Sequence, residues 1–152
     1  MRSAFTLIEI MIVIVILGIL AAIVIPGTVD ISGQVRQTAF INSGKIFAAA
    51  ARRYELDRGE YPDAQPGQLP DGFGEYIQSM KWQRETPIGG LWQARAPGGG
   101  VRAALGVRYQ NNDPDHDPAV MQAIDEEVDD GDLGTGVFRE FGGRRYFFVI
   151  AE

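Results

Sequence analysis

The chain has 152 residues and a formal net charge of −6, and it contains no cysteine. The absence of cysteine excludes a disulfide framework, a thiolate nucleophile and a cysteine-based zinc site. The basic residues are scattered, with Arg52-Arg53 and Arg144-Arg145 as the only doublets, so no nucleic-acid partner is expected.

The first predicted element is an apolar helix with one carboxylate near its start. Residues 10–25 are all apolar or glycine, and Glu9 directly precedes them. As a helix, the run from Phe5 to Ile25 would be about 30 Å long, which matches the hydrocarbon thickness of a bilayer. A charge at mid-bilayer costs at least ~2.5 kcal/mol, so Glu9 needs a functional reason. A secretory signal peptide fits poorly, because Arg2 alone supplies the positive region and the apolar run is too long.

The residues at this N-terminus carry a family resemblance. The stretch Phe5-Thr6-Leu7-Ile8-Glu9, the apolar run and Ile25-Pro26 resemble the processing and methylation motif of type IV pilins and type II secretion pseudopilins. The resemblance implies a leader of residues 1–4, cleavage by a prepilin peptidase between Ala4 and Phe5, and N-methylation of Phe5. The family has Gly before the cut, and this chain has Ala4, which is also small.

The resemblance also implies assembly roles for Glu9 and Pro26. In a bundle of helices, the amine of Phe5 in one subunit would pair with Glu9 of its neighbour and offset the cost of two charges in an apolar setting. In the alternative, Glu9 only lies at the membrane edge of an ordinary anchor. Pro26 would kink or loosen the helix by removing a backbone donor.

An amphipathic pattern over residues 27–58 predicts that the helix continues, from about Thr6 to Leu56. The apolar positions at helical spacing are Ile31, Val35, Ala39, Ile46, Ala50 and Tyr54. Gly44 and two other glycines each lower intrinsic helix stability by up to ~1 kcal/mol, so either tertiary packing holds the helix or the glycines permit local melting during assembly. Gly59 and Pro62 predict the helix end, and Gly59-Glu60-Tyr61-Pro62 resembles the helix exit of the major pseudopilin.

Residues 59–152 are predicted to form one small globular α+β domain, with a short helix near residues 74–81. Strands at 91–94 and 101–109, and at 137–141 and 145–150, flank glycine-rich turns and read as two hairpins. The predicted fold class is α+β, with a long N-terminal helix whose first half spans the membrane and whose second half packs against an antiparallel sheet of about four strands. Trp82 and Trp92, with Phe73 and Tyr76, are expected in the core.

The negative charge is concentrated in one segment. Between Asn111 and Asp132, nine residues are Asp or Glu and none is Lys or Arg. The alternating oxygens of Asp113, Asp115 and Asp117 suit a Ca²⁺ ion, and the resemblance adds that major pseudopilins bind calcium in a loop before the C-terminus.

A purely structural interpretation of the same segment stays open beside the calcium site. Here Asp117 is the N-cap of a helix that starts at Pro118 and ends near Val128, with Gly131 just beyond it. The remaining carboxylates would then face water or a basic partner surface; they are Asp125, Glu126, Glu127, Asp129 and Asp130.

The expected function is structural. His116 is the only histidine, and no Ser-His-Asp or Cys-His arrangement points to an enzyme.

The resemblance implies a filament subunit anchored by residues 5–26 in the bacterial inner membrane, with its domain in the periplasm. The implied partners are identical or related pilin-like subunits, a prepilin peptidase, the assembly platform and the membrane. The alternative is a single-pass, membrane-anchored periplasmic binding module that does not polymerise. The lack of cysteine and the Gly59–Pro62 exit favour a secretion pseudopilus over a surface pilus or a DNA-uptake fibre.

Overall fold

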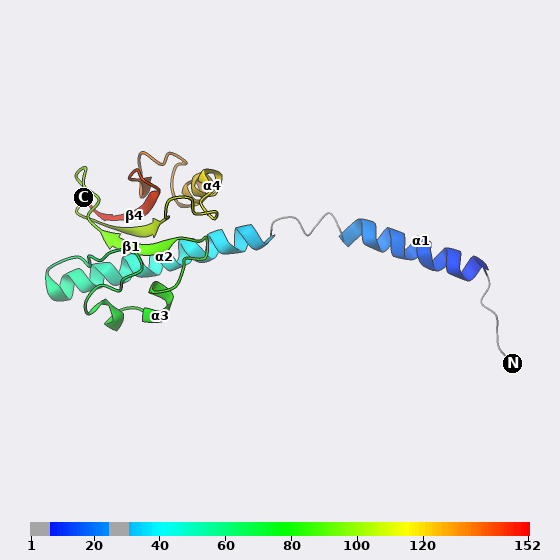
Figure 1. The fold of residues 1–152 in the computed structure, drawn as a ribbon, viewed down its shortest axis with the longest axis horizontal. Coiled ribbons are helices and arrows are strands. Elements are labelled where there is room, and N and C mark those ends of the chain that lie inside the picture. The colour runs from blue at the N-terminus through cyan, green and yellow to red at the C-terminus, as the bar shows by residue number, and fades with distance from the viewer. Residues whose placement is uncertain (1–6, 25–30) are drawn as a thin grey trace. The chain divides into compact units, whose positions relative to one another are not determined.

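The computed structural model describes residues 7–24 and 31–152. The chain divides into two units, Met1–Gln34 and Val35–Glu152. In chain order the elements are α1 (Leu7–Val24), α2 (Ile31–Arg58), the 3-10 helix η2 (Phe73–Glu75), α3 (Ser79–Trp82), β1 (Leu91–Arg95), β2 (Ala103–Arg108), α4 (Pro118–Val128), β3 (Phe138–Glu140) and β4 (Arg145–Ala151), as Figure 1 shows.

Helix α1 exposes apolar side chains on every side. Its large apolar residues from Leu7 to Leu20 range from 47% exposed at Val13 to 78% at Leu7. Glu9 lies in the first turn, where a carboxylate interacts favourably with the helix dipole. Across the described parts of the chain, no helix is both long and apolar enough to cross a membrane. The predicted helix start at Thr6 and the predicted continuity through Pro26 lie outside the described residues.

Helix α2 buries part of the predicted face, since Ala50 and Tyr54 are 6% and 5% exposed. Val35 and Ile46 were expected on the packed side, and each is 61% exposed. The buried positions instead centre on Phe40, Phe47 and Ala51, because the aromatic rings of the first two fill the core better than the aliphatic residues beside them. The predicted end of the helix is confirmed: Gly59 has a φ of 76° and its N–H donates to the carbonyl of Glu55 at 2.7 Å.

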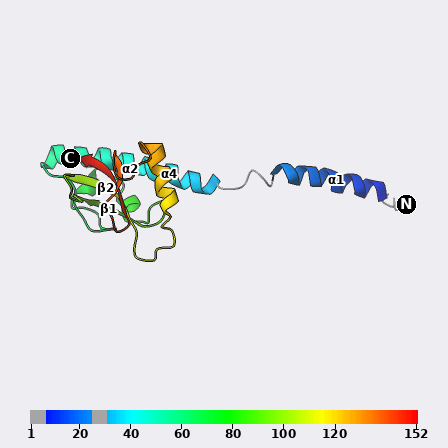
Figure 2. The same ribbon diagram turned by 90° about the horizontal axis from the view of Figure 1, so that it is seen from above.

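The predicted α+β fold is confirmed, with four antiparallel strands in the order β1-β2-β4-β3. Both expected hairpins form, one from β1 and β2 and one from β3 and β4. The central pair is β2 and β4, in which Gly106 lies opposite Phe147 and Leu105 opposite Phe148. The sheet lies along the C-terminal part of α2, and Figure 2 shows the same layers from above.

Aromatic rings join α2 to the sheet and to the loop before it. Phe40 stacks on Trp92 of β1, with ring centroids 5.1 Å apart, and Phe47 meets the same indole edge-on at 4.9 Å. Trp82 and Phe73 are fully buried against this group, as expected, and the Trp82 indole donates to the carbonyl of Gln68 at 2.7 Å. The residues between α2 and β1 therefore form one side of the core.

Candidate metal centre

Helix α4 forms as its capping signals predict. The Asp117 side chain accepts a hydrogen bond from the N–H of Ala119 at 2.9 Å, and Pro118 occupies the first helical position. Met121 and Ile124 are fully buried and fix the face that α4 turns to the core. Since Asp125 follows Met121 by four residues, it shares that face.

Asp125 is the feature that sequence reasoning missed. The structural interpretation of the acidic segment placed its carboxylate in water or against a partner surface, and this was wrong, because the residue is 0% exposed. Neither carboxylate oxygen accepts a hydrogen bond of good geometry, although the backbone N–H of Gly131 lies near enough to lower the pKa of the group slightly against the larger effect of burial. A buried ionised group without partners is strongly unfavourable, so such a carboxylate requires a proton or a cation. The signal that could have found it is the spacing of Met121, Ile124, Asp125 and Val128, which is that of a buried helix face.

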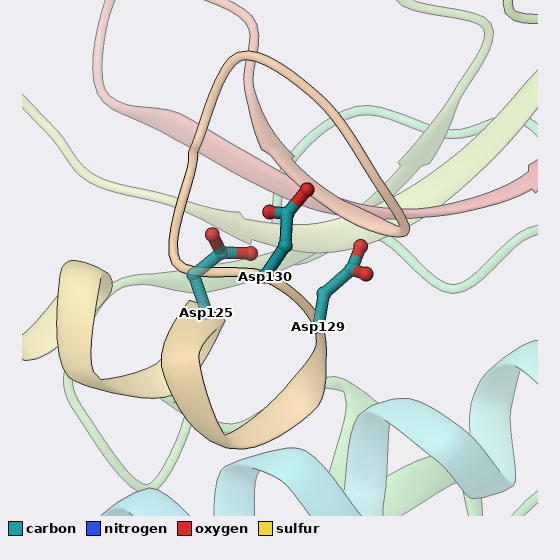
Figure 3. Close-up of side chains that lie close together, drawn as sticks. All are labelled: Asp125, Asp129 and Asp130. Atoms are coloured by element: carbon teal, nitrogen blue, oxygen red, sulfur yellow. The ribbon is translucent and has the colours of Figure 1, made fainter.

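Two further carboxylates converge on Asp125. Oxygens of Asp125, Asp129 and Asp130 all lie within 4.8 Å of one another. Figure 3 shows the three side chains gathered where α4 ends and the following loop begins. Among residues 7–24 and 31–152, no other set of three Asp, Glu, Cys or His side chains meets this geometric condition.

Backbone donors hold the two exposed members of this cluster in place. The Asp129 carboxylate accepts from the N–H of Val137, and Asp130 accepts from the N–H of Asp132 and the hydroxyl of Thr135, both at 3.0 Å. Gly136, with a φ of 72°, leaves room for Asp129, since a Cβ at this position would collide with that carboxylate. The loop from Asp129 to Val137 is therefore folded around its own carboxylates.

The pKa values of Asp125 and Asp130 shift in opposite directions. Burial, and then the charges of Asp130, Asp129 and Asp132, raise the pKa of Asp125 above its ordinary value. The hydrogen bonds from Asp132 and Thr135 lower the pKa of Asp130. The exposed carboxylate thus stays ionised while the buried one resists ionisation, and a bound cation would favour the ionised form of both.

The chemistry of these donors fits a hard divalent cation. Ca²⁺ takes about six to eight oxygen ligands in irregular geometry, often from carboxylates, whereas Mg²⁺ demands a near-ideal octahedron. The three carboxylates come from adjacent turns, and one of them is buried. This irregular set of oxygens suits the coordination of Ca²⁺ better than the octahedral coordination of Mg²⁺. We therefore identify Asp125, Asp129 and Asp130 as the candidate metal centre of this chain.

The predicted calcium ligands are arranged differently. Within the described part of the chain, Asp113, Asp115 and Asp117 do not form a cluster of this kind. Asp113 accepts from the N–H of Asp115 at 3.1 Å, and Asp117 caps α4. His116 between them lies 3.0 Å from the hydroxyl of Tyr146 through its Nε2, which fastens the loop to β4. These carboxylates organise the loop and the start of α4.

The other predicted site residues fall at the N-terminus. Ala4, Phe5 and Pro26 lie outside the described residues, whereas Glu9 lies within α1. Their roles in processing and assembly stay predictions.

Comparisons with known proteins give relatives of one kind. The family described as "Prokaryotic N-terminal methylation motif" matches residues 1–25. The chain is 38% identical over 110 residues to the type II secretion system core protein G of Pseudomonas aeruginosa, covering 64% of this chain and 75% of that protein. It is 32% identical over 109 residues to the type IV major pilin protein PilE1 of Neisseria gonorrhoeae, covering 69% of this chain and 49% of the pilin.

A solved structure shares the fold. The major type IV pilin PilA1 of Clostridium difficile superposes with a TM-score of 0.51 at 13% identity, over 79% of this chain and 97% of that one. At this identity the similarity concerns the fold alone.

Proposed function

Since this chain belongs to the family of type II secretion system core protein G, we propose that it is a pseudopilin, a structural subunit of a pilin-like filament. The relatives reported above are named as core and pilin proteins, which supports a structural role and no catalytic one. In this proposal identical or related subunits are the principal partners.

The main observation in support of this proposal is the exposed apolar surface of α1. A helix that is apolar on all sides is stable only when its surface leaves water, either in a membrane or among other helices. The large apolar side chains from Leu7 to Leu20 are at least 47% exposed, so about half or more of their surface is available to neighbouring copies. At about 25 cal/mol per Å² of buried apolar surface, packing such helices together is strongly favourable.

The N-terminal residues supply the processing and the register of this assembly. A prepilin peptidase cuts between Ala4 and Phe5, removes residues 1–4 and methylates Phe5, and the motif match over residues 1–25 supports this step. The new amine of one copy pairs with Glu9 of the next, which sets the axial register. Pro26 loosens the chain between residues 5–26 and 27–58.

The location follows from the same segment. Before assembly, the apolar residues 5–26 hold the subunit in the inner membrane, and Arg2 ahead of them favours a cytoplasmic N-terminus. The domain of residues 59–152 then lies in the periplasm, where an assembly platform adds the subunit to the filament.

Mass spectrometry of the mature chain tests the processing step. We expect a chain that begins at Phe5 and carries one added methyl group. Glu9→Ala should be processed and remain in the membrane yet form no filaments in electron micrographs, and Glu9→Asp should retain part of the assembly. An uncut Met1 in a chain that never polymerises would instead favour the membrane-anchored binding module.

A second function is favoured by the buried carboxylate of Asp125. We further propose that Asp125, Asp129 and Asp130 bind Ca²⁺, which would neutralise the only one of the three that is fully buried. The ion would join the end of α4 to the loop before β3 and stabilise this corner of the domain.

Calorimetric titration of the full chain in detergent tests this site. We expect Ca²⁺ to bind more tightly than Mg²⁺ and to raise the unfolding temperature. Asp125→Asn should abolish both effects. Asp113→Asn is the matched control, since it removes a carboxylate from the same acidic segment outside the cluster, and it should leave Ca²⁺ binding unchanged. If Asp113→Asn abolished Ca²⁺ binding and Asp125→Asn did not, the ion would bind at the loop of Asp113 and not at Asp125.

A further inference from the structure

Helix α2 presents an aliphatic and basic surface on its exposed side, where Ile46 also lines a hollow with Tyr76 and Lys81 of the segment around α3. We call this surface the outer stripe of α2 and define it by its exposed residues, which are Val35, Asn42, Ile46, Ala49, Arg53 and Leu56. Their spacing places them on one face of the helix, opposite Phe40 and Phe47, which pack on β1. Ile46 is 61% exposed and Leu56 is 79% exposed, which is unusual for the free face of a domain helix.

From Val35 to Arg53 the charged residues of α2 are all basic, whereas the exposed Asp57 adjoins the end of the outer stripe at Leu56. Lys45 and Arg52 flank the stripe, and both are exposed. Between Ile31 and Tyr54, α2 contains four basic residues and no acidic residue. An aliphatic centre with a basic rim has the composition of a docking surface for an acidic partner.

The same chain carries an acidic surface of similar design. We call residues 126–132 the acidic segment; Glu126, Glu127 and Asp132 are exposed there and lie outside the proposed metal centre. Val137, which is 49% exposed, adjoins the segment because its N–H donates to Asp129. In Figure 1, α4 and the chain that follows it lie on the side of α2 that carries the sheet.

Neither surface is neutralised within one copy. Among the described residues two ion pairs form, Arg58 with Glu75 and Arg139 with Glu152. Neither ion pair includes a residue of the outer stripe or of the acidic segment. The basic residues beside the stripe and the carboxylates of the acidic segment therefore remain unpaired with each other within one copy. Two complementary patches on different parts of one subunit make a head-to-tail contact, which produces a filament when the rotation between copies does not close a ring.

We propose that the outer stripe of α2 in one copy docks on the acidic segment of a neighbouring copy. The aliphatic residues of the stripe would pack on Val137, and Arg53 with its basic neighbours would face Glu126 and Glu127. This inference rests on the proposed filament and adds to it a contact between domains, separate from the packing of α1.

Disulfide trapping tests the contact directly, because the natural chain has no cysteine. Copies carrying Arg53→Cys and copies carrying Glu127→Cys, each with its own tag, are expressed together, and filaments are oxidised. We expect a mixed dimer that contains both tags. The control pairs Arg95→Cys, an exposed position at the end of β1, with Glu127→Cys and should yield no mixed dimer.

Charge reversal supplies a second measurement. Arg52→Glu with Arg53→Glu should lower the filament yield about tenfold, and adding Glu126→Lys with Glu127→Lys should restore most of it. Filaments that form normally without the mixed dimer, and that tolerate the reversed charges, would overturn this contact and leave the proposed function intact. A folded, processed chain that forms no filaments at all would overturn both.

Discussion

The ring of Phe148 on β4 lies directly against the backbone of Gly44 on α2. A Cβ built on Gly44 would lie 2.7 Å from Cζ and 2.8 Å from Cδ2 of that ring. Phe148 has little freedom to withdraw, since it packs on Phe138 with centroids 4.9 Å apart and on Phe40 at 5.6 Å. Gly44 therefore allows a close approach of helix and sheet, and this packing gives a physical reason for a glycine at this position.

Gly44→Ala is expected to destabilise the domain by about 1–3 kcal/mol, because overpacking outweighs the ~1 kcal/mol that alanine gains in helix propensity. Urea unfolding followed by tryptophan fluorescence measures this, as both tryptophans are buried in the domain. Asn42→Ala, at an exposed position of the same helix, should be neutral or slightly stabilising. A stabilised Gly44→Ala variant would contradict the packing argument.

The cap of α4 offers a prediction that separates its structural role from ion binding. Asp117→Ala should cost about 1 kcal/mol through loss of the hydrogen bond to Ala119. The loss should be the same in chelator and in Ca²⁺, since we place the ion at Asp125. A loss that appears only with Ca²⁺ would mark Asp117 as a ligand after all.

Asp125 predicts a specific dependence of stability on pH. Its pKa is raised in the folded state, mainly by burial, above the ordinary value of 3.8. Without divalent cations, the folded state therefore carries no penalty at pH values below 3.8, and stability falls as the pH rises through the raised pKa. The difference in unfolding free energy between the wild type and Asp125→Asn should follow this course. Ca²⁺ should reverse the sign of the difference near neutral pH, and a difference independent of pH would contradict the buried ionisation.

The hydroxyl of Tyr109 predicts a measurable hydrogen-bond contribution. It donates to the carbonyl of Ile88 at 3.0 Å, and both residues are buried. Tyr109→Phe should cost about 1–3 kcal/mol, because the carbonyl loses its buried partner. Tyr76→Phe is the matched control, since the hydroxyl of Tyr76 meets Asp57 at an exposed position, and it should cost less than about 0.5 kcal/mol. An equal loss of unfolding free energy in the two variants would show that burial does not determine the contribution of the hydrogen bond.

Much of the fold could be predicted from local patterns. The end of α2 at Gly59, the capped helix α4 and both hairpins follow from residues close together in sequence. The buried face of α2 was predicted only in part. Helical periodicity locates the apolar residues on one side of the helix, but it does not show which of them pack against the sheet. Val35 and Ile46 fit the helical period as well as Phe40 and Phe47, but the sheet offers an aromatic surface at Trp92, and the rings fill it.

The candidate site shows the same division. The sequence suggested Ca²⁺ ligands at Asp113, Asp115 and Asp117, and that site stays a prediction. The cluster that forms lies one helix later, because α4 must bury Met121 and Ile124, and this rotation carries Asp125 inward.

The sequence by itself determined the features that depend on neighbouring residues: the apolar helix with Glu9 at its start, the N-terminal motif, the α+β class and the concentration of negative charge. Only the tertiary structure decided which side chains meet: Gly44 with Phe148, Phe40 with Trp92, and Asp125 with Asp129 and Asp130. The physical reason is that the period of a helix or strand fixes the direction of each side chain from that element alone. Which of these side chains is buried depends on the shape of the element packed against it.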